Sequence, residues 1–188
     1  ISGGLAGGDT ISITAATGAG ANLTLTSQAA ERVYRSLGPP AEIDVTLQAA
    51  AGSHLFWLPQ ETILFDGAGL TRRYDVTLDD GAEFLALEAI LFGRTEMGEK
   101  IQQVSMRDRW RIRRGNALLH ADDLVIDGPL PQTAATLRHA GAMATLIIIS
   151  QRAEFLVDRL RAALEGDCAV SAWNGKLIAR IVARDGFQ

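Results

Sequence analysis

Short segments in which apolar and polar residues alternate occupy the chain from its start to about Asp127. A two-residue period is typical of a strand with one buried face, and Gly, Pro, Asn or Asp separates the segments. The strands predicted in this part are 10–15, 22–27, 43–49, 70–78, 84–92, 101–106 and 110–114. The pattern therefore predicts a mainly β fold built from short strands.

Two more features in the last third of the chain indicate strands. The run 144–149 is continuously apolar, which predicts a buried, central strand. Asn174 and Gly175 separate two alternating segments, 169–173 and 177–183. A type I′ hairpin turn needs positive φ at both central residues, and this pair suits it. We therefore predict a β-hairpin near the end of the chain.

Two α-helices are predicted in the C-terminal part. The segment 131–140 has apolar residues at helical spacing and a proline at its first position. The segment 152–165 carries a longer apolar stripe, with Ser150 as a candidate N-cap. Gly166 follows, and a glycine in the left-handed region commonly ends a helix.

Composition limits the class of protein. The chain has 188 residues, of which 47% are hydrophobic and 21% charged, so one globular domain spanning 1–188 is expected. The net charge is −4, and no apolar run is long enough to cross a bilayer, so neither nucleic acid nor a membrane is an expected partner. The dense arginine cluster 107–114 is interpreted as a solvated strand face with Trp110 and Ile112 inside. A surface for an acidic partner is the alternative.

Common catalytic patterns do not occur in the sequence. A single Cys168 and three separated histidines give no zinc-type spacing, and G-x-S-x-G is absent. The glycine-rich start ends in Asp9 and leads into a strand, without the lysine of a P-loop. A tight turn braced by Asp9 is the structural interpretation, and a functional Asp9 is the alternative. Hydrolase chemistry is therefore disfavoured.

The carboxylates are the more informative candidates. Glu88 interrupts an otherwise apolar strand, so it must be paired, with Arg94 as one candidate, or be neutral, or face water or a cation. Ion pairing or turn bracing is the simpler interpretation for each acid. Oxygen ligands without His or Cys bind a borderline divalent ion weakly and exchange it quickly, which suits transit better than storage.

Four motifs in register resemble the UreD family of urease accessory proteins, called UreH in some bacteria. They are GGLAGGD at 3–9, LTSQAA running into VYRS at 25–36, LPQETI at 58–63 and FGRTEMGE at 92–99. Where the last motif usually has a small residue, this chain has Thr95 and Glu96. Family members carry residues before the glycine motif and beyond the end of this chain, so both termini are expected to be trimmed. The start at Ile1, without Met or a signal-peptide pattern, agrees with this expectation.

The resemblance implies a fold and a role. The fold is a β-helix-like stack of short strands with two α-helices in the C-terminal part. The role is that of a cytoplasmic, non-enzymatic scaffold that binds UreF, and through it the GTPase UreG, docks on apo-urease and assists nickel delivery. No tightly bound cofactor is implied, only transient nickel(II).

The resemblance also implies an internal passage for nickel, lined partly by acids. The candidates by position are Asp9, Glu61, Glu88, Glu96, Glu99 and Asp122. The motif residues expected to shape the fold or bind partners are Gly7, Gly8, Gln28, Tyr34, Pro59, Gln60, Gly93, Arg94 and Gly98. Two alternatives remain: a purely structural adaptor without metal conduction, and a β-helical carbohydrate enzyme using an acid pair such as Glu96 and Glu99.

Overall fold

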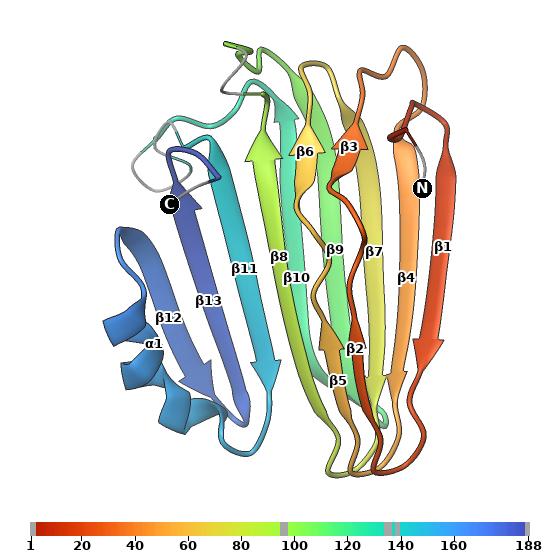
Figure 1. The fold of residues 1–188 in the computed structure, drawn as a ribbon, viewed down its shortest axis with the longest axis vertical. Helices are drawn as coiled ribbons and strands as arrows, with labels where there is room; N and C mark the ends of the chain where they lie inside the picture. Colours follow the sequence, from red (N-terminus) through yellow and green to blue (C-terminus); the bar gives the residue numbers. More distant parts are fainter. Residues whose placement is uncertain (1–2, 95–97, 134–136, 138–139, 187–188) are drawn as a thin grey trace.

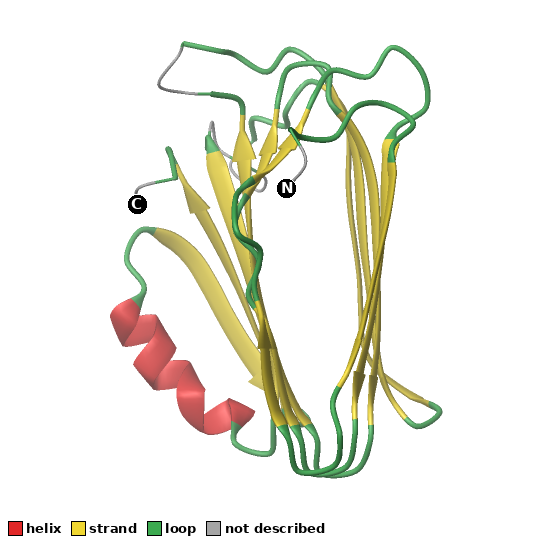
Figure 2. Ribbon diagram, turned by 45° about the vertical axis from the view of Figure 1, so that its right-hand side comes forward, coloured by secondary structure: helices red, strands yellow, loops and turns green. Residues whose placement is uncertain are grey.

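Two β-sheets face each other across the core of this computed structural model, which describes residues 3–94, 98–133, 137 and 140–186 (Figures 1 and 2). The first sheet has five strands in the order β1 (Thr10–Ala16), β4 (Ala41–Ala49), β7 (Gly69–Leu78), β9 (Val104–Arg114) and β10 (Ala117–Gly128). The second has the order β12 (Asp167–Trp173), β13 (Lys176–Ala183), β11 (Ala142–Ile149), β8 (Glu83–Phe92), β5 (His54–Trp57) and β2 (Asn22–Leu25). Beside β8, β6 (Thr62–Leu64) pairs with β3 (Glu31–Val33).

The N-terminal part is a solenoid. The chain passes from the first sheet to the second and back, so that β1, β4, β7 and β9 stack in parallel on one side. In the second sheet, β2, β5 and β8 also pair in parallel. From β9 onward the pairing is antiparallel, through β10 and through β8, β11, β13 and β12. The predicted mainly β, stacked architecture is confirmed.

Several local predictions are also confirmed. The apolar run 144–149 forms most of β11, which lies between β8 and β13. Asn174 and Gly175 have φ of 51° and 71° and join β12 to β13, as a type I′ turn requires. The two strands predicted at 101–106 and 110–114 are one strand, β9, because the alternation of buried and exposed positions continues through the arginines.

The prediction of two C-terminal helices needs correction. The structure describes one α-helix there, α1 (Val157–Ala163), preceded by a 3-10 turn (Ala153–Leu156). The other predicted helix, 131–140, falls partly outside the described residues, and none of its described residues is helical. Ser150 does not cap α1. Its Oγ instead donates to Glu83 at 2.6 Å and accepts from the N–H of Arg152.

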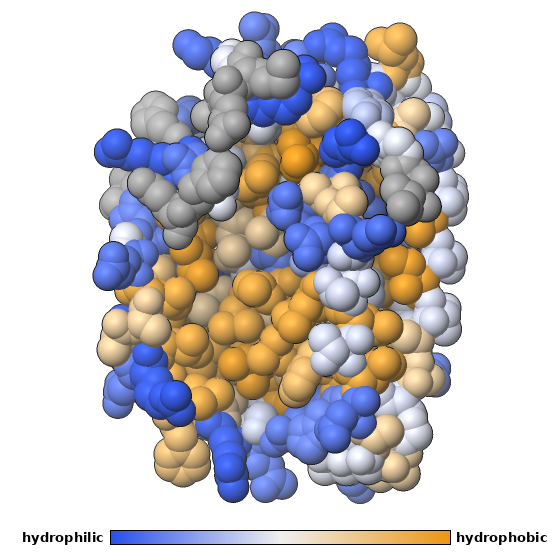
Figure 3. Space-filling view, viewed as in Figure 1, coloured by the Kyte–Doolittle hydropathy of each residue, from blue (hydrophilic) through white to orange (hydrophobic). Residues whose placement is uncertain are grey.

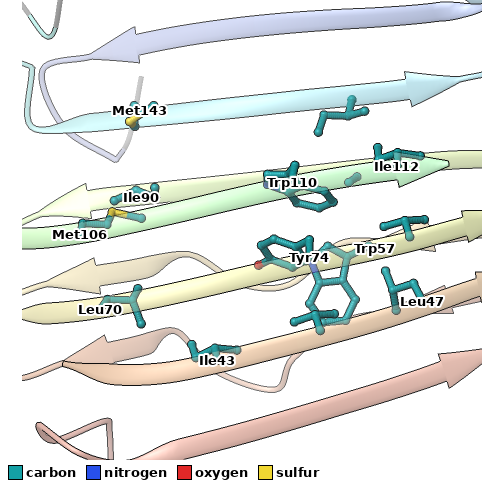
Figure 4. Packing of buried hydrophobic residues seen from close by; sticks show 14 of the residues in the cluster. Ile43, Leu47, Trp57, Leu70, Tyr74, Ile90, Met106, Trp110, Ile112 and Met143 are labelled. Atoms are coloured by element: carbon teal, nitrogen blue, oxygen red, sulfur yellow. The ribbon is translucent and has the colours of Figure 1, made fainter. Parts of the chain in front are cut away.

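The main core lies between the sheets. Tyr74 of β7 stacks on Trp110 of β9, with ring centroids 3.8 Å apart, and Trp57 approaches Tyr74 from the opposite sheet (Figure 4). A second, smaller core lies where the helical segment packs on β12 and β13. Beside it the outer face of the second sheet is rich in apolar side chains (Figure 3), among them Leu87, which is exposed. Among the described residues, no helix has the length and apolar content that a bilayer crossing requires.

Candidate functional site: a row of charged residues between the sheets

Three charged side chains meet inside the core. Arg72 of β7 and Asp108 of β9 are direct cross-strand partners, and Arg72 Nη2 donates to Asp108 Oδ2 at 2.6 Å. The same nitrogen donates to Glu88 Oε2, which comes from β8 of the other sheet, at 3.1 Å. The three side chains are only 3–6% exposed. One guanidinium thus forms a buried ion pair with an acid of its own sheet and another with an acid of the facing sheet.

Further hydrogen bonds hold this central cluster in place. The Tyr74 hydroxyl and the Trp57 indole N–H both donate to Glu88 Oε1, the indole at 3.3 Å. Arg72 Nη1 donates to Thr62 Oγ1 at 3.0 Å. Two buried atoms, Arg72 Nε and Asp108 Oδ1, have no hydrogen-bond partner among the described residues. The cluster is therefore held by several hydrogen bonds, but not all of its polar atoms have a partner among the described residues.

The cluster contains one more acid than base. Burial raises the pKa of Glu88 to about 7, against the opposing effect of Arg72. Burial also raises the pKa of Tyr74 well above its ordinary value, so its hydroxyl keeps its proton. Although burial opposes the charge on Arg72, Asp108 and Glu88 hold its pKa well above the ordinary value. The cationic Arg72 therefore neutralises one carboxylate, and the second calls for a proton or a cation.

A cavity of about 340 Å³ reaches the cluster from one side. Its rim includes the exposed residues Ser27, Gln28 and Gln60, and its inner wall includes Arg72 and Tyr74. Glu31 also lines this cavity, which we call the larger cavity. Burial raises the pKa of Glu31, against the opposing effect of Arg72. Pro59 is a further lining residue. Three residues of the second and third sequence motifs, Gln28, Pro59 and Gln60, thus surround an opening that leads to a buried charged cluster.

A cavity of about 20 Å³ lies on the other side of the cluster, lined by Glu88, Asp108, Asp122, Thr145 and Arg180 among others. Such a volume holds about one water molecule. Glu88, Thr145 and Arg180 are aligned across β8, β11 and β13 by the strand register. Arg180 forms an ion pair with Asp122, and their side chains are 36% and 26% exposed. The smaller cavity therefore ends close to the surface.

Six charged side chains line these two cavities or the cluster between them, and together we call them the interior row. It consists of Glu31, Arg72, Glu88, Asp108, Asp122 and Arg180. Its carboxylates offer exchangeable oxygen ligands, whereas its arginines contribute positive charge and hydrogen-bond donors. Among the described residues, no three His, Cys, Asp or Glu side chains form a group that could hold a metal ion. The candidate cation ligands in the row are therefore single carboxylates on separate strands.

Two of the predicted passage acids belong to the interior row, Glu88 and Asp122. The predicted candidate partner of Glu88 was Arg94, but its partner in the structure is Arg72. Arg94 instead binds Glu99, whose Oε2 accepts from Arg94 Nε and N at 3.0 Å each. A neighbour in sequence was expected, whereas Arg72 lies on β7 of the facing sheet.

The other described acids lie elsewhere. Asp9 Oδ2 accepts from the N–H of Ala6 at 2.8 Å and so braces the glycine turn, as in the structural interpretation. Glu61 is partly exposed and immediately precedes β6, and its carbonyl accepts from the N–H of Glu31. Glu96 lies outside the described residues. For these acids and Glu99, a role in metal transfer stays a prediction.

The motif at 92–99 anchors a loop. Although partial burial opposes it, hydrogen bonds from Arg94 and from the N–H of Asp66 lower the pKa of Glu99. The Arg94 guanidinium lies over the Phe65 ring at 4.6 Å. Gly93 and Gly98 have φ of 79° and 71°, a region that favours glycine. Arg94 and Glu99 line neither of the two cavities, and their contacts give the described residues of this motif a structural purpose.

The remaining motif residues pack the first loop against the next coil. A Cβ on Gly7 would lie 2.2 Å from Ser36 Oγ, and Gly8 has a φ of 86°. The Tyr34 hydroxyl donates to the carbonyl of Gly3 at 2.7 Å, and its ring packs edge-on against Phe65. These contacts give the first motif a structural purpose, while any role in partner binding stays a prediction.

Sequence reasoning missed the other four members of the row. Arg72 occupies an inward position of β7, in phase with Leu70 and Tyr74. Asp108 falls between Met106 and Trp110 on the inward face of β9. A charge at a buried position of an alternating strand is therefore the signal that could have found both. Glu31 and Arg180 carry no such signal, because their strands are short or only half-buried.

Comparison with known proteins agrees with the motifs. The family described as UreD urease accessory protein matches residues 1–188. The chain is 44% identical to a urease accessory protein UreD of Rhodopseudomonas palustris, over 99% of this chain and 67% of that protein. It is also 44% identical to the UreD of Agrobacterium fabrum, over 100% and 67%, and 46% identical to a UreD 3 of Bradyrhizobium, over 97% and 68%. The chain belongs to the UreD family of urease accessory proteins.

Proposed function

We propose that this chain is a non-enzymatic urease maturation factor that helps to deliver nickel(II) to the urease active site. In this role it binds UreF, reaches UreG through UreF, and docks on apo-urease in the cytoplasm. No nucleic-acid or membrane partner is part of the proposal. The observation that supports nickel delivery is the interior row, which links an open cavity on one side to the Asp122–Arg180 pair near the surface on the other.

The chemistry of the row suits a transported ion. Its candidate ligands are carboxylate oxygens, which bind nickel more weakly than imidazole or thiolate and release it more readily. Glu31 lies at the larger cavity, Glu88 and Asp108 lie in the core, and Asp122 lies beside the smaller cavity. Successive acids at these positions would give an ion stepwise sites across an otherwise apolar interior.

A purely structural adaptor is the second candidate, and one observation favours it. Arg72 is bonded to both Glu88 and Asp108, so the central cluster could serve only to join the two sheets. In that case the chain would assemble the partners, and its interior acids would have no part in metal transfer. Substitutions in the row that leave assembly intact separate the two candidates.

The experiment compares two neighbouring residues. Asp122 lies in the interior row and Asp123 lies on the outer face, paired with Arg111 at 2.6 Å. The chain and its Asp122→Asn and Asp123→Asn variants are tested for co-purification with UreF and apo-urease, and then for urease activation with nickel. Each substitution removes one charge and breaks one arginine pair, so the change in charge is the same.

The proposal expects all three proteins to bind the partners and only Asp122→Asn to lower urease activation. Equal activation by both variants, with partners bound, would favour the structural adaptor. A chain that binds neither UreF nor apo-urease would contradict the scaffold role itself. Assembly and nickel transfer are thus tested separately in one series.

A further inference from the structure

The wall between the two cavities is built around one guanidinium. Arg72 lines the larger cavity, while Glu88 and Asp108 line the smaller one. Arg72 Nη2 contacts both acids, at 3.1 Å and 2.6 Å. The side of the guanidinium that faces the acids thus forms the boundary between the two spaces. An ion that entered through the larger cavity would meet this positive charge before it reached Glu88 and Asp108.

The position of Arg72 Nη2 is one that a cation would favour. Glu88 Oε2 and Asp108 Oδ2 come from opposite sheets and converge on this single nitrogen. The other oxygen of Asp108 is buried and has no hydrogen-bond partner among the described residues. Two carboxylates with a single positive charge between them leave a net negative charge in the buried core, which is costly unless a further cation or a proton balances it. A divalent ion at this point would balance both.

We propose that Arg72 is a plug that occupies a divalent-cation site formed by Glu88 and Asp108, and that the site opens when Arg72 turns into the larger cavity. The identity of the cation as nickel(II) rests on the proposed function. The larger cavity, of about 340 Å³, has room for the displaced side chain. Glu31 lines that cavity and lies close enough to interact electrostatically with Arg72, so the displaced guanidinium has a second acidic partner.

With such a plug in place, an ion in the larger cavity cannot reach the site between Glu88 and Asp108 until Arg72 moves. While Arg72 lies between the acids, its charge repels any cation that enters the larger cavity. The site then becomes available only when something displaces Arg72, and in the proposed pathway that step would coincide with partner docking. Arginine suits this role because it stays charged when buried and its planar head can hydrogen-bond to two carboxylates at once.

The test asks whether removing the plug creates a metal site. Nickel(II) alone is titrated into the chain and into Arg72→Met, and binding is measured by equilibrium dialysis at neutral pH. The matched control is Arg73→Met, because Arg73 is the next residue on β7 but lies on the outer face, paired with Asp44 at 3.0 Å. A further variant, Arg72→Met with Asp108→Asn, removes one proposed ligand.

The plug predicts about one nickel ion per Arg72→Met chain, and none at the same concentration for the wild type or Arg73→Met. Adding Asp108→Asn should abolish the gained binding. A folded Arg72→Met chain that binds no nickel would overturn the proposal. If Arg72→Met does not fold, Arg72→Gln takes its place with the same expected result, because the amide can still donate to one acid.

The wild type provides a test that needs no Arg72 variant. Trp57 contacts Glu88, and Trp110 lies beside it, so nickel bound at the site should quench their fluorescence. If Arg72 keeps the site closed, nickel should quench the fluorescence of the wild type no more than that of Asp108→Asn. Quenching in the wild type that Asp108→Asn abolishes would show an open site and contradict the plug.

These titrations contain no urease and no accessory partner, so their outcome is independent of the proposed function. Nickel binding by Arg72→Met together with normal urease activation by Asp122→Asn would support the plug and reject transport along the row. No nickel binding by Arg72→Met, together with lower urease activation by Asp122→Asn, would reject the plug and support transport along the row.

Discussion

Arg72 and Asp108 lie opposite each other on the parallel strands β7 and β9, and Arg72 also reaches Glu88 on the facing sheet. Residues 16 and 36 positions from Arg72 in the sequence thus share one guanidinium. A buried ion pair contributes little net stability while it is intact, but losing one partner leaves an uncompensated charge. The cost of substitution in this cluster therefore depends on which partner is removed.

Arg72→Met should be the more damaging change, because it leaves two carboxylates facing each other in the core. We expect it to lower the free energy of unfolding by about 3 kcal/mol or more. Asp108→Asn leaves one base and one acid, so we expect a loss of only about 1 kcal/mol. Urea unfolding of both variants measures the difference. Equal losses would show that charge balance does not govern this cluster.

The stability of the chain should depend on the protonation of Glu88. Its pKa is raised from 4.5 in the unfolded chain to about 7 in the fold, because burial disfavours the charge. The folded state then binds the proton more tightly, so this contribution to stability is complete below pH 4.5 and is lost as the pH rises through about 7. Other groups titrate in the acid range, so the comparison needs a variant that lacks this one.

Glu88→Gln is that variant, since its side chain stays neutral at every pH. We expect the difference in unfolding free energy between wild type and Glu88→Gln to change between about pH 5 and 7, with the wild type losing stability as the pH rises. The measurement is urea unfolding at several pH values without divalent ions. A difference that is independent of pH would mean that the folded Glu88 keeps an ordinary pKa.

The glycine turn offers a purely steric prediction. A Cβ on Gly7 would approach Ser36 Oγ at 2.2 Å and the carbonyl of Pro39 at 2.9 Å. Gly7→Ala should therefore lower the unfolding free energy by about 1–3 kcal/mol. Gly38→Ala is the control, because its Cβ would meet no atom within 4 Å. Thermal unfolding compares the two, and equal midpoints would indicate that the turn adjusts without cost.

The loop anchored by Arg94 and Glu99 should affect stability without affecting nickel transfer. Glu99→Gln removes the ion pair at 3.0 Å and weakens the hydrogen bonds to the loop, for an expected loss of about 1 kcal/mol. Because Glu99 lies outside both cavities, urease activation should match that of the wild type at a temperature where both are folded. Lower activation with normal stability would place Glu99 in the transfer route.

The fold was largely predictable because the alternation of apolar and polar residues along a strand follows the alternation of buried and exposed side chains. A two-residue period locates strands such as β4 and β7, and the Asn174–Gly175 pair fixes a hairpin through its backbone requirements. The helical segment was overestimated in length because an apolar stripe alone does not set where a helix starts. Ser150, expected as the N-cap, instead donates to Glu83 of a distant strand.

The site was only partly predictable, for a geometric reason. Glu88 stood out because a charge interrupts an apolar strand, but its partner could not be named from sequence spacing. In a solenoid the nearest charges come from the next coil and from the facing sheet, as Arg72 and Asp108 show. The pairing depends on the length of each coil and on the strand register, which a pattern of hydrophobic residues does not fix.

The nickel content of urease tests the central claim most directly. Ala30 lines the larger cavity, so Ala30→Trp would narrow the way to Arg72 without changing any charge. Ala16→Trp, on the exposed end of β1, is the control. Apo-urease is incubated with each variant, UreF, UreG and nickel, and the metal in the purified urease is measured. We expect both variants to assemble with the partners and only Ala30→Trp to lower the nickel content of urease. Full nickel incorporation through the narrowed cavity would contradict the central claim.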